Sequence, residues 1–263
     1  MNSVQDFARL KAEGRRISIV ATYDAWSAAV IARSQVDAIL VGDSAAMVVH
    51  GHPTTLPATV DMMSLHTAAV TRAAAGKLVI ADLPFLSCRK GIAAAMDSVG
   101  ALMTSGAHAV KLEGVDGHED VIRHIGGSGV PVMGHIGLTP QSVRQFGGFR
   151  VQGKSEAEAG QLLRQAHTLE DLGCFAIVLE CVPAALAARI TSELRLPTIG
   201  IGAGAGTDGQ VLVLHDILGL DTGQTPRFVR RYLDGERVVT DALNHYDSDV
   251  KAGLFPAAEE SYS

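Results

Sequence analysis

The sequence lacks the features that mark secreted, membrane-spanning and zinc-binding proteins. Its three cysteines show no CxxC spacing, and an odd set of this kind indicates neither a disulfide framework nor a zinc site. No apolar run approaches the ~18 residues of a membrane span, and residues 1–16 mix acidic with basic side chains where a targeting signal would be apolar. We therefore expect a cytoplasmic protein that binds no membrane.

Positive charge and aromatic residues are also scarce. Lys and Arg number 22 against 28 Asp and Glu, and the resulting net charge of −6 argues against a nucleic-acid partner. Aromatic residues make up only 5% of the chain, whereas glycine contributes 28 of the 263 residues, above the ~7% of average usage. This composition predicts tight turns, an aliphatic core and a small-molecule partner.

The chain does contain eight short apolar runs. Their near-continuous apolar character, without alternation, is typical of parallel strands that are covered on both faces. The expected strands are residues 17–22, 38–42, 78–82, 109–112, 130–134, 176–180, 198–202 and 210–214. Helical spacing occupies most gaps, at residues 24–34, 93–105, 118–126, 155–172 and 183–194. Since no linker divides the chain, we expect an α/β protein with a single (β/α)₈ barrel domain over residues 1–263.

Polar residues stand at the ends of six expected strands, where such barrels carry their chemistry. They are Tyr23, Asp24, Asp43, Ser44, Asp82, Lys111, Glu113, His135 and Glu180. An acid directly after a strand often caps the next helix, so each of these residues alone has a structural interpretation. Lys111 and Glu113 lie two residues apart and share one strand face, which we expect to point into the barrel.

Several carboxylates buried beside one lysine would cost many kcal/mol unless an ion or ligand neutralised them. Asp43, Asp82 and Glu113 offer only oxygen ligands, which suit Mg²⁺ better than zinc or copper. Glu180 emerges from the apolar run AIVL, and such surroundings favour a general base. His135 has two open interpretations, a donor to a substrate oxygen or a structural histidine.

Two glycine-rich segments imitate nucleotide-binding loops. Residues 148–155 match GxxxxGK[ST], but the polar and helix-like segment 139–145 precedes them where a phosphate loop needs a buried strand, so we expect a surface loop. Residues 200–206 fail the GxGxxG spacing and lead into an expected strand. They are either a tight strand-to-strand turn or part of the active-site mouth.

Nine segments together resemble the ketopantoate hydroxymethyltransferase family: GDSAAMV, GHPTTLPATVD, ADLPF, KLEG, PVMGHIGLTPQS, GGFRVQGK, VLECVP, IGIGAG and DGQVLVLHD. The resemblance implies a TIM barrel of the phosphoenolpyruvate/pyruvate-like type with one Mg²⁺ per subunit. It implies hydroxymethyl transfer from 5,10-methylenetetrahydrofolate to 3-methyl-2-oxobutanoate, the first step of pantothenate synthesis. It further implies a homo-oligomer, typically a decamer.

The same resemblance assigns roles to six residues by motif. The carboxylates of GDS, ADLPF and KLEG are the implied metal ligands, and some of them act through water. The ketoacid is bound at the same three motifs. The glutamate of VLECVP is the implied proton acceptor. The metal set is Asp43, Asp82 and Glu113, the ketoacid set is Asp43, Ser44, Asp82 and Lys111, and the acceptor is Glu180. The chain departs from the family pattern near the pocket, at Ala45, Ala46, Cys88 and Val115, which leaves the preferred ketoacid open.

Two other functions stay open at this point. A Mg²⁺-dependent carbon–carbon lyase of the isocitrate-lyase type would carry a reactive cysteine in a KKCGH-like context, which none of Cys88, Cys174 and Cys181 has. A non-catalytic metabolite-binding barrel would have lost the base, whereas Glu180 is present.

Overall fold

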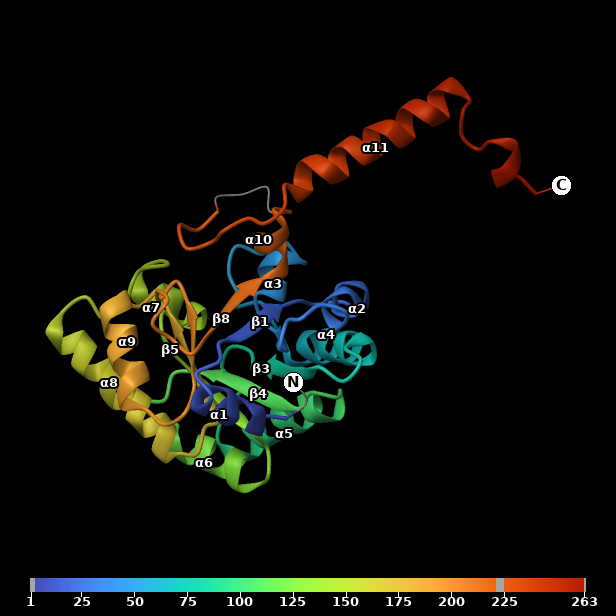
Figure 1. The fold of residues 1–263 in the computed structure, drawn as a ribbon. Coiled ribbons are helices and arrows are strands. Elements are labelled where there is room, and N and C mark those ends of the chain that lie inside the picture. Colours follow the sequence, from blue (N-terminus) through green and yellow to red (C-terminus); the bar gives the residue numbers. More distant parts are fainter. Residues whose placement is uncertain (1–2, 221–224, 263) are drawn as a thin grey trace. The chain divides into compact units, whose positions relative to one another are not determined.

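Eight parallel strands close into one barrel in the order of the sequence (Figure 1). The computed structural model describes residues 3–220 and 225–262. The strands are β1 (Ile17–Ala21), β2 (Ala38–Val41), β3 (Leu78–Asp82), β4 (Ala109–Glu113), β5 (Val132–Gly137), β6 (Ala176–Glu180), β7 (Thr198–Ile201) and β8 (Gly209–Val213). Every position of β2 and β3 is buried, as strands covered on both faces require. The predicted (β/α)₈ barrel is confirmed.

Helices cover the outside of the barrel. They are α1 (Gln5–Ala12), α2 (Ala25–Ala32), α3 (Ala45–Val48), α4 (Val60–Ala73), α5 (Ile92–Thr104), α6 (Glu119–Gly127), η1 (Pro140–Ser142), α7 (Val143–Phe146), α8 (Glu156–Asp171) and α9 (Ala184–Glu193). The five expected helices agree with α2, α5, α6, α8 and α9. The expected series missed α4, whose buried face is Met63, Thr67 and Val70, because one of its three inward positions is polar.

The predicted end of the fifth strand was wrong. β5 continues past Gly134 to Gly137, so His135 lies within the strand and opposite Glu113 of β4. Gly134 does not end the strand; it makes room for α8, because an added Cβ there would lie 2.7 Å from a methyl carbon of Leu169.

β7 and β8 are joined without a helix, so strand and helix do not alternate eight times as expected. Residues 202–208 form a turn, and the interpretation as a tight strand-to-strand connection is correct for them. An added Cβ at Gly204 or Gly206 would lie 2.5 or 2.7 Å from the Cβ atoms of Ala184 and Ala188, so the glycines let this turn pack on α9.

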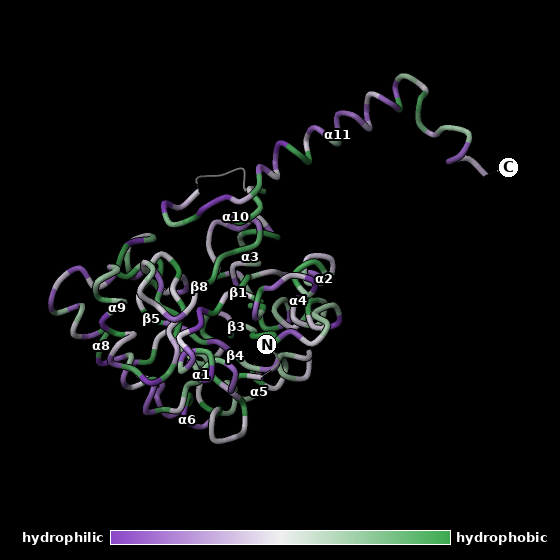
Figure 2. Tube along the Cα trace, in the orientation of Figure 1, coloured by the Kyte–Doolittle hydropathy of each residue, from purple (hydrophilic) through white to green (hydrophobic). Residues whose placement is uncertain are grey.

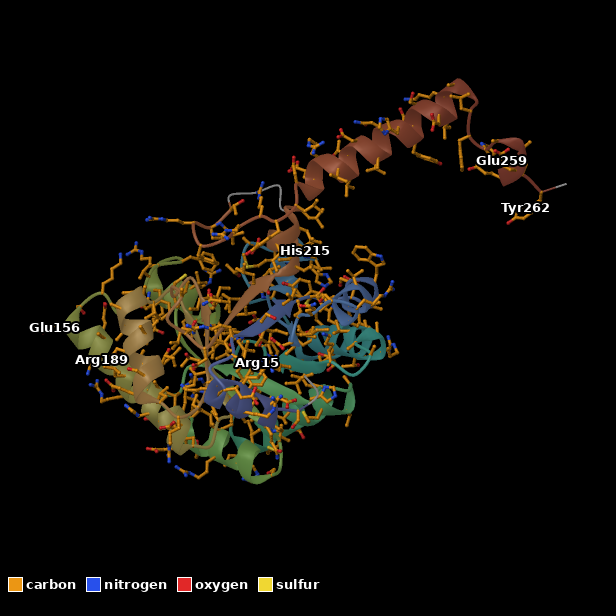
Figure 3. All side chains as sticks on the ribbon, in the orientation of Figure 1. Arg15, Glu156, Arg189, His215, Glu259 and Tyr262 are labelled. Atoms are coloured by element: carbon orange, nitrogen blue, oxygen red, sulfur yellow. The ribbon has the colours of Figure 1, made fainter. Side chains whose placement is uncertain are left out.

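The segment that imitates a phosphate loop ends in an ordinary helix cap. The Ser155 side chain accepts a hydrogen bond from the Glu158 N–H, and the Glu158 carboxylate accepts from Ser155 N–H, which together form a capping box. No strand immediately precedes this segment, because α7 and Gly147 do, and the surface-loop prediction holds. Glu156 of α8 and Arg189 of α9 point away from the barrel into solvent (Figure 3).

The chain divides into two compact units, Met1–Leu212 and Val213–Ser263. The second contains α10 (Leu214–Leu218), α11 (Gly235–Ala252) and η2 (Ala258–Glu260), and hydrophilic and hydrophobic residues alternate along α11 (Figure 2). Within the described residues, no helix has the length and apolar character needed to cross a membrane. The prediction of a single domain over residues 1–263 stays a prediction.

Candidate active site

A buried ion pair joins two neighbouring strands at the carboxyl end of the barrel. Asp82 ends β3 and lies opposite Lys111 of β4, and the Lys111 ammonium donates to Asp82 Oδ1 over 2.7 Å. Both side chains are at most 5% exposed. Burial lowers the pKa of Lys111, but the three carboxylates around it outweigh burial and raise that pKa above its ordinary value. Lys111 is therefore a fixed positive charge in this site.

The carboxylates of Asp43 and Glu113 meet at one residue, Gln141. The Gln141 side-chain amide donates to Asp43 Oδ2 over 2.8 Å, and its backbone N–H donates to Glu113 Oε2 over 2.9 Å. The Asp43 backbone N–H donates to Asp82 Oδ2 over 3.2 Å. The three predicted metal carboxylates thus share one hydrogen-bond network, as their positions after β2, β3 and β4 led us to expect.

His135 lies between the carboxylates of Glu113 and Glu180. Its Nδ1 is 3.5 Å from Glu113 Oε1 and its Nε2 is 3.2 Å from Glu180 Oε2. Neither ring nitrogen has a hydrogen-bond partner, so these contacts are ion pairs when the ring is protonated. Burial, and then Lys111, lower the pKa of His135, but the two carboxylates outweigh both and raise it to about 9. The structure places His135 between two site carboxylates, and a role as donor to a substrate oxygen stays a prediction.

Ser44 follows Asp43 and contacts a residue of β1's carboxyl end. Its hydroxyl lies 2.8 Å from the hydroxyl of Tyr23, which is fully buried. The next residue, Asp24, has the structural role, because its carboxylate accepts the Ser27 N–H over 2.9 Å and caps α2. Tyr23 therefore belongs to the site and Asp24 to the scaffold.

The donor set fits a divalent cation that prefers oxygen ligands. Burial raises the pKa of Asp43 well above its ordinary value, and the nearby charges of Glu113 and Asp82 raise it further. A divalent cation would relieve this surplus of negative charge. Across residues 3–220 and 225–262, no three Asp, Glu, His or Cys side chains converge closely enough to ligate one ion directly, so water would complete its coordination, as is common for Mg²⁺.

Comparison with known proteins decides the family. A sequence profile described as ketopantoate hydroxymethyltransferase matches residues 1–258. The chain belongs to the ketopantoate hydroxymethyltransferase family. It is 53% identical over 263 residues, with full coverage of both chains, to 3-methyl-2-oxobutanoate hydroxymethyltransferase of Bdellovibrio bacteriovorus. Its identity to the protein of the same name from Coxiella burnetii (strain CbuK_Q154) is 50%, with 97% and 96% of the two chains covered.

Family membership confirms the predicted enzyme class, a transferase of hydroxymethyl groups. Solved structures similar in fold include phosphonopyruvate hydrolase, with a TM-score of 0.64, 11% identity and coverage of 99% of this chain and 93% of that one. Another is 2,3-dimethylmalate lyase of the PEP mutase/isocitrate lyase superfamily, with a TM-score of 0.62, 15% identity and coverage of 100% and 92%. These likenesses support the barrel fold, and the phosphoenolpyruvate/pyruvate-like type stays a prediction.

The three cysteines do not support the alternative function as a carbon–carbon lyase. Burial raises the pKa of the Cys88 thiol to about 11 and that of Cys174 to about 12. Burial and the adjacent Glu180 raise the pKa of Cys181 to about 11. All three thiols therefore stay protonated near neutral pH and are poor nucleophiles or bases.

Proposed function

We propose that this chain transfers a hydroxymethyl group from 5,10-methylenetetrahydrofolate to 3-methyl-2-oxobutanoate with the help of Mg²⁺, giving ketopantoate and tetrahydrofolate. The observation that carries the proposal is the meeting of Glu180, Lys111 and three carboxylates at one end of the barrel. A base, a fixed cation and an oxygen-rich metal site are what deprotonation beside a ketone requires.

The ketoacid would be held by Lys111 and Ser44. The Lys111 ammonium is fixed by its ion pair with Asp82, and the Ser44 hydroxyl is oriented by Tyr23. Both groups can donate hydrogen bonds to the ketoacid's oxygens. Because the two side chains are already held in place, they lose little conformational freedom when negative charge develops on those oxygens. These two donors would therefore favour the enolate over the ketoacid.

Mg²⁺ would be held by Asp43, Asp82 and Glu113, in part through water. When bound, a divalent ion supplies Lewis acidity that stabilises negative charge on the ketoacid's oxygens, a contribution of several kcal/mol.

Glu180 would take the proton from C3 of the ketoacid. Its side chain is 15% exposed, so it is shielded from bulk water yet accessible to a substrate in the barrel mouth. The C3 carbon then forms a bond with the methylene carbon of the folate as a carbon–nitrogen bond of the folate breaks. The oxygen of a water molecule replaces the other carbon–nitrogen bond of that methylene carbon before C3 attacks. The proton held by Glu180 and one proton of the water pass to the two folate nitrogens, which leaves the hydroxymethyl group on C3 and returns tetrahydrofolate.

Proton exchange tests the base independently of the folate. Purified protein with Mg²⁺ should exchange the C3 proton of 3-methyl-2-oxobutanoate for deuterium without folate, as followed by NMR. Glu180→Gln should reduce exchange by at least ~10²-fold, the typical contribution of a general base, while ketoacid binding stays largely intact. The matched control Glu156→Gln changes an exposed glutamate of α8 and should exchange normally. Normal exchange by Glu180→Gln would refute the base assignment.

The same assay over several branched 2-oxoacids tests the substrate assignment. Ala45, Ala46, Cys88 and Val115, where we expect a departure from the family pattern, are all buried. Fastest exchange with 3-methyl-2-oxobutanoate supports the proposed ketoacid, whereas a clear preference for a longer 2-oxoacid would replace it.

A further inference from the structure

Gln141 lies where four successive strand ends come together. It belongs to η1, beyond β5, and its side-chain amide donates to Asp43 Oδ2 after β2 and to the Leu83 carbonyl after β3, over 2.8 and 3.0 Å. Its backbone N–H donates to Glu113 Oε2 at the end of β4 over 2.9 Å. One neutral residue thus bridges two of the carboxylates assigned above to the metal and ties both to the backbone of a third strand end.

The chemistry of an amide suits this position better than that of a charged donor. Asp43 and Glu113 are like-charged groups brought to one residue, and the hydrogen bonds that they accept from Gln141 offset their repulsion. A lysine or arginine here would cancel the negative charge that attracts a divalent cation. An amide N–H offsets the repulsion and leaves the net charge of the cluster unchanged.

The two hydrogen bonds also restrict the orientation of both carboxylates. The Gln141 side-chain amide engages Oδ2 of Asp43 and its backbone N–H engages Oε2 of Glu113, while Oε1 of Glu113 faces His135 Nδ1. Hydrogen bonds of this kind to metal carboxylates typically change metal affinity by ~10–100-fold.

We propose that Gln141 is a positioning residue that fixes Asp43 and Glu113 in the orientation that binds the divalent cation. The inference rests on the proposed function, because it assumes that these carboxylates hold the metal. Gln141 acts through the two carboxylates and need not touch the ketoacid.

The test measures metal binding directly. Mn²⁺ is titrated into the full chain without substrate, and free Mn²⁺ is followed by electron paramagnetic resonance. Gln141→Met keeps the length of the side chain and removes its donor, so the Mn²⁺ dissociation constant should rise by ~10–100-fold. Gln141→Asn keeps the amide, but its side chain is one methylene too short to reach the same acceptors. Its Mn²⁺ dissociation constant should therefore rise as well. The control Gln145→Met alters an exposed glutamine of α7 and should leave binding unchanged.

A second measurement separates positioning from damage to the fold. Because only metal affinity should fall, saturating Mn²⁺ should restore kcat in Gln141→Met, and its melting temperature with saturating Mn²⁺ should approach that of the wild type. Unchanged Mn²⁺ affinity in both variants, or a loss of kcat that saturating metal does not restore, would overturn the inference. If the wild-type chain itself binds no Mn²⁺, the metal assignment of the proposed function fails, and this inference falls with it.

Discussion

At the scale of single residues, the site sets four carboxylates against two basic side chains. Lys111 pairs with Asp82, and His135, when protonated, pairs with Glu113 and Glu180. The Asp43 carboxylate accepts a hydrogen bond from a neutral amide, and burial, followed by the charges of Glu113 and Asp82, raises its pKa well above its ordinary value. The site therefore lacks positive charge, which a bound metal cation would supply, and this supports the metal assignment.

Lys111→Met tests the buried ion pair. The substitution leaves Asp82 buried without its ammonium partner, and breaking such a pair costs about 3–5 kcal/mol of the free energy of unfolding. Ketoacid binding should weaken together with stability because the fixed positive charge is lost. Urea denaturation and isothermal titration with 3-methyl-2-oxobutanoate measure the two effects. Lys154→Met, at an exposed position, is the control; equal stability of both variants would contradict this account of Lys111.

The residue patterns found most of the site but not all of it. The carboxylates, Lys111 and Glu180 could be predicted because charged residues at the ends of apolar strands are conspicuous in sequence. Gln141 was predicted only as part of a polar segment, since a neutral amide after a Thr-Pro turn has many structural uses. Its role depends on acceptors 28 and 98 residues away, Glu113 and Asp43.

At the scale of elements, the strands set the depth of each functional group. Parallel pairing puts Asp82 opposite Lys111 and Glu113 opposite His135, while Glu180 lies opposite Gly137 at the end of β5. Gly137 has φ of +94°, and an added Cβ would overlap the carbonyl oxygen of Glu180. The close approach of β5 to β6 therefore requires glycine at this position.

Gly137→Ala should displace the strand end that carries Glu180. We expect a loss of at least about 2 kcal/mol in the free energy of unfolding, since both backbone strain and overlap with β6 are introduced. C3 proton exchange should fall as well, because Glu180 moves. Gly147→Ala is a matched control, with φ of +67° but no atom within 4 Å of the added Cβ, so it should lose only the strain. Equal losses in the two variants would show that strain alone, without the overlap, explains the effect.

At the scale of the whole molecule, the excess of negative charge has a local component. The chain carries a formal charge of −6, and Asp43, Asp82, Glu113 and Glu180 all lie at one end of the barrel. A bound divalent cation would offset part of that charge. The predicted decamer and cytoplasmic location stay predictions.

Metal removal and addition should change the stability of the whole fold. A ligand that binds only the native state stabilises it by about 2.7 kcal/mol when its concentration is a hundredfold above its dissociation constant. For a domain of this size that corresponds to a rise in melting temperature of several degrees, roughly 2–4 °C per kcal/mol. Scanning calorimetry with Mg²⁺ against EDTA at constant ionic strength measures it. The double variant Asp43→Asn, Glu113→Gln should show no shift, and an equal shift there would place the cation elsewhere.

The sequence by itself determined the barrel, because eight apolar runs at parallel-strand spacing can be covered on both faces in few other ways. It also identified the charged groups of the site, because these residues stand at the ends of several of the apolar runs. Only the tertiary structure decided how these groups pair. Strand register put His135 within β5 beside Glu113, and the turn after β5 brought Gln141 onto two carboxylates distant in sequence. Hydrogen bonds and ion pairs depend on distances of about 3 Å, which strand periodicity alone cannot specify.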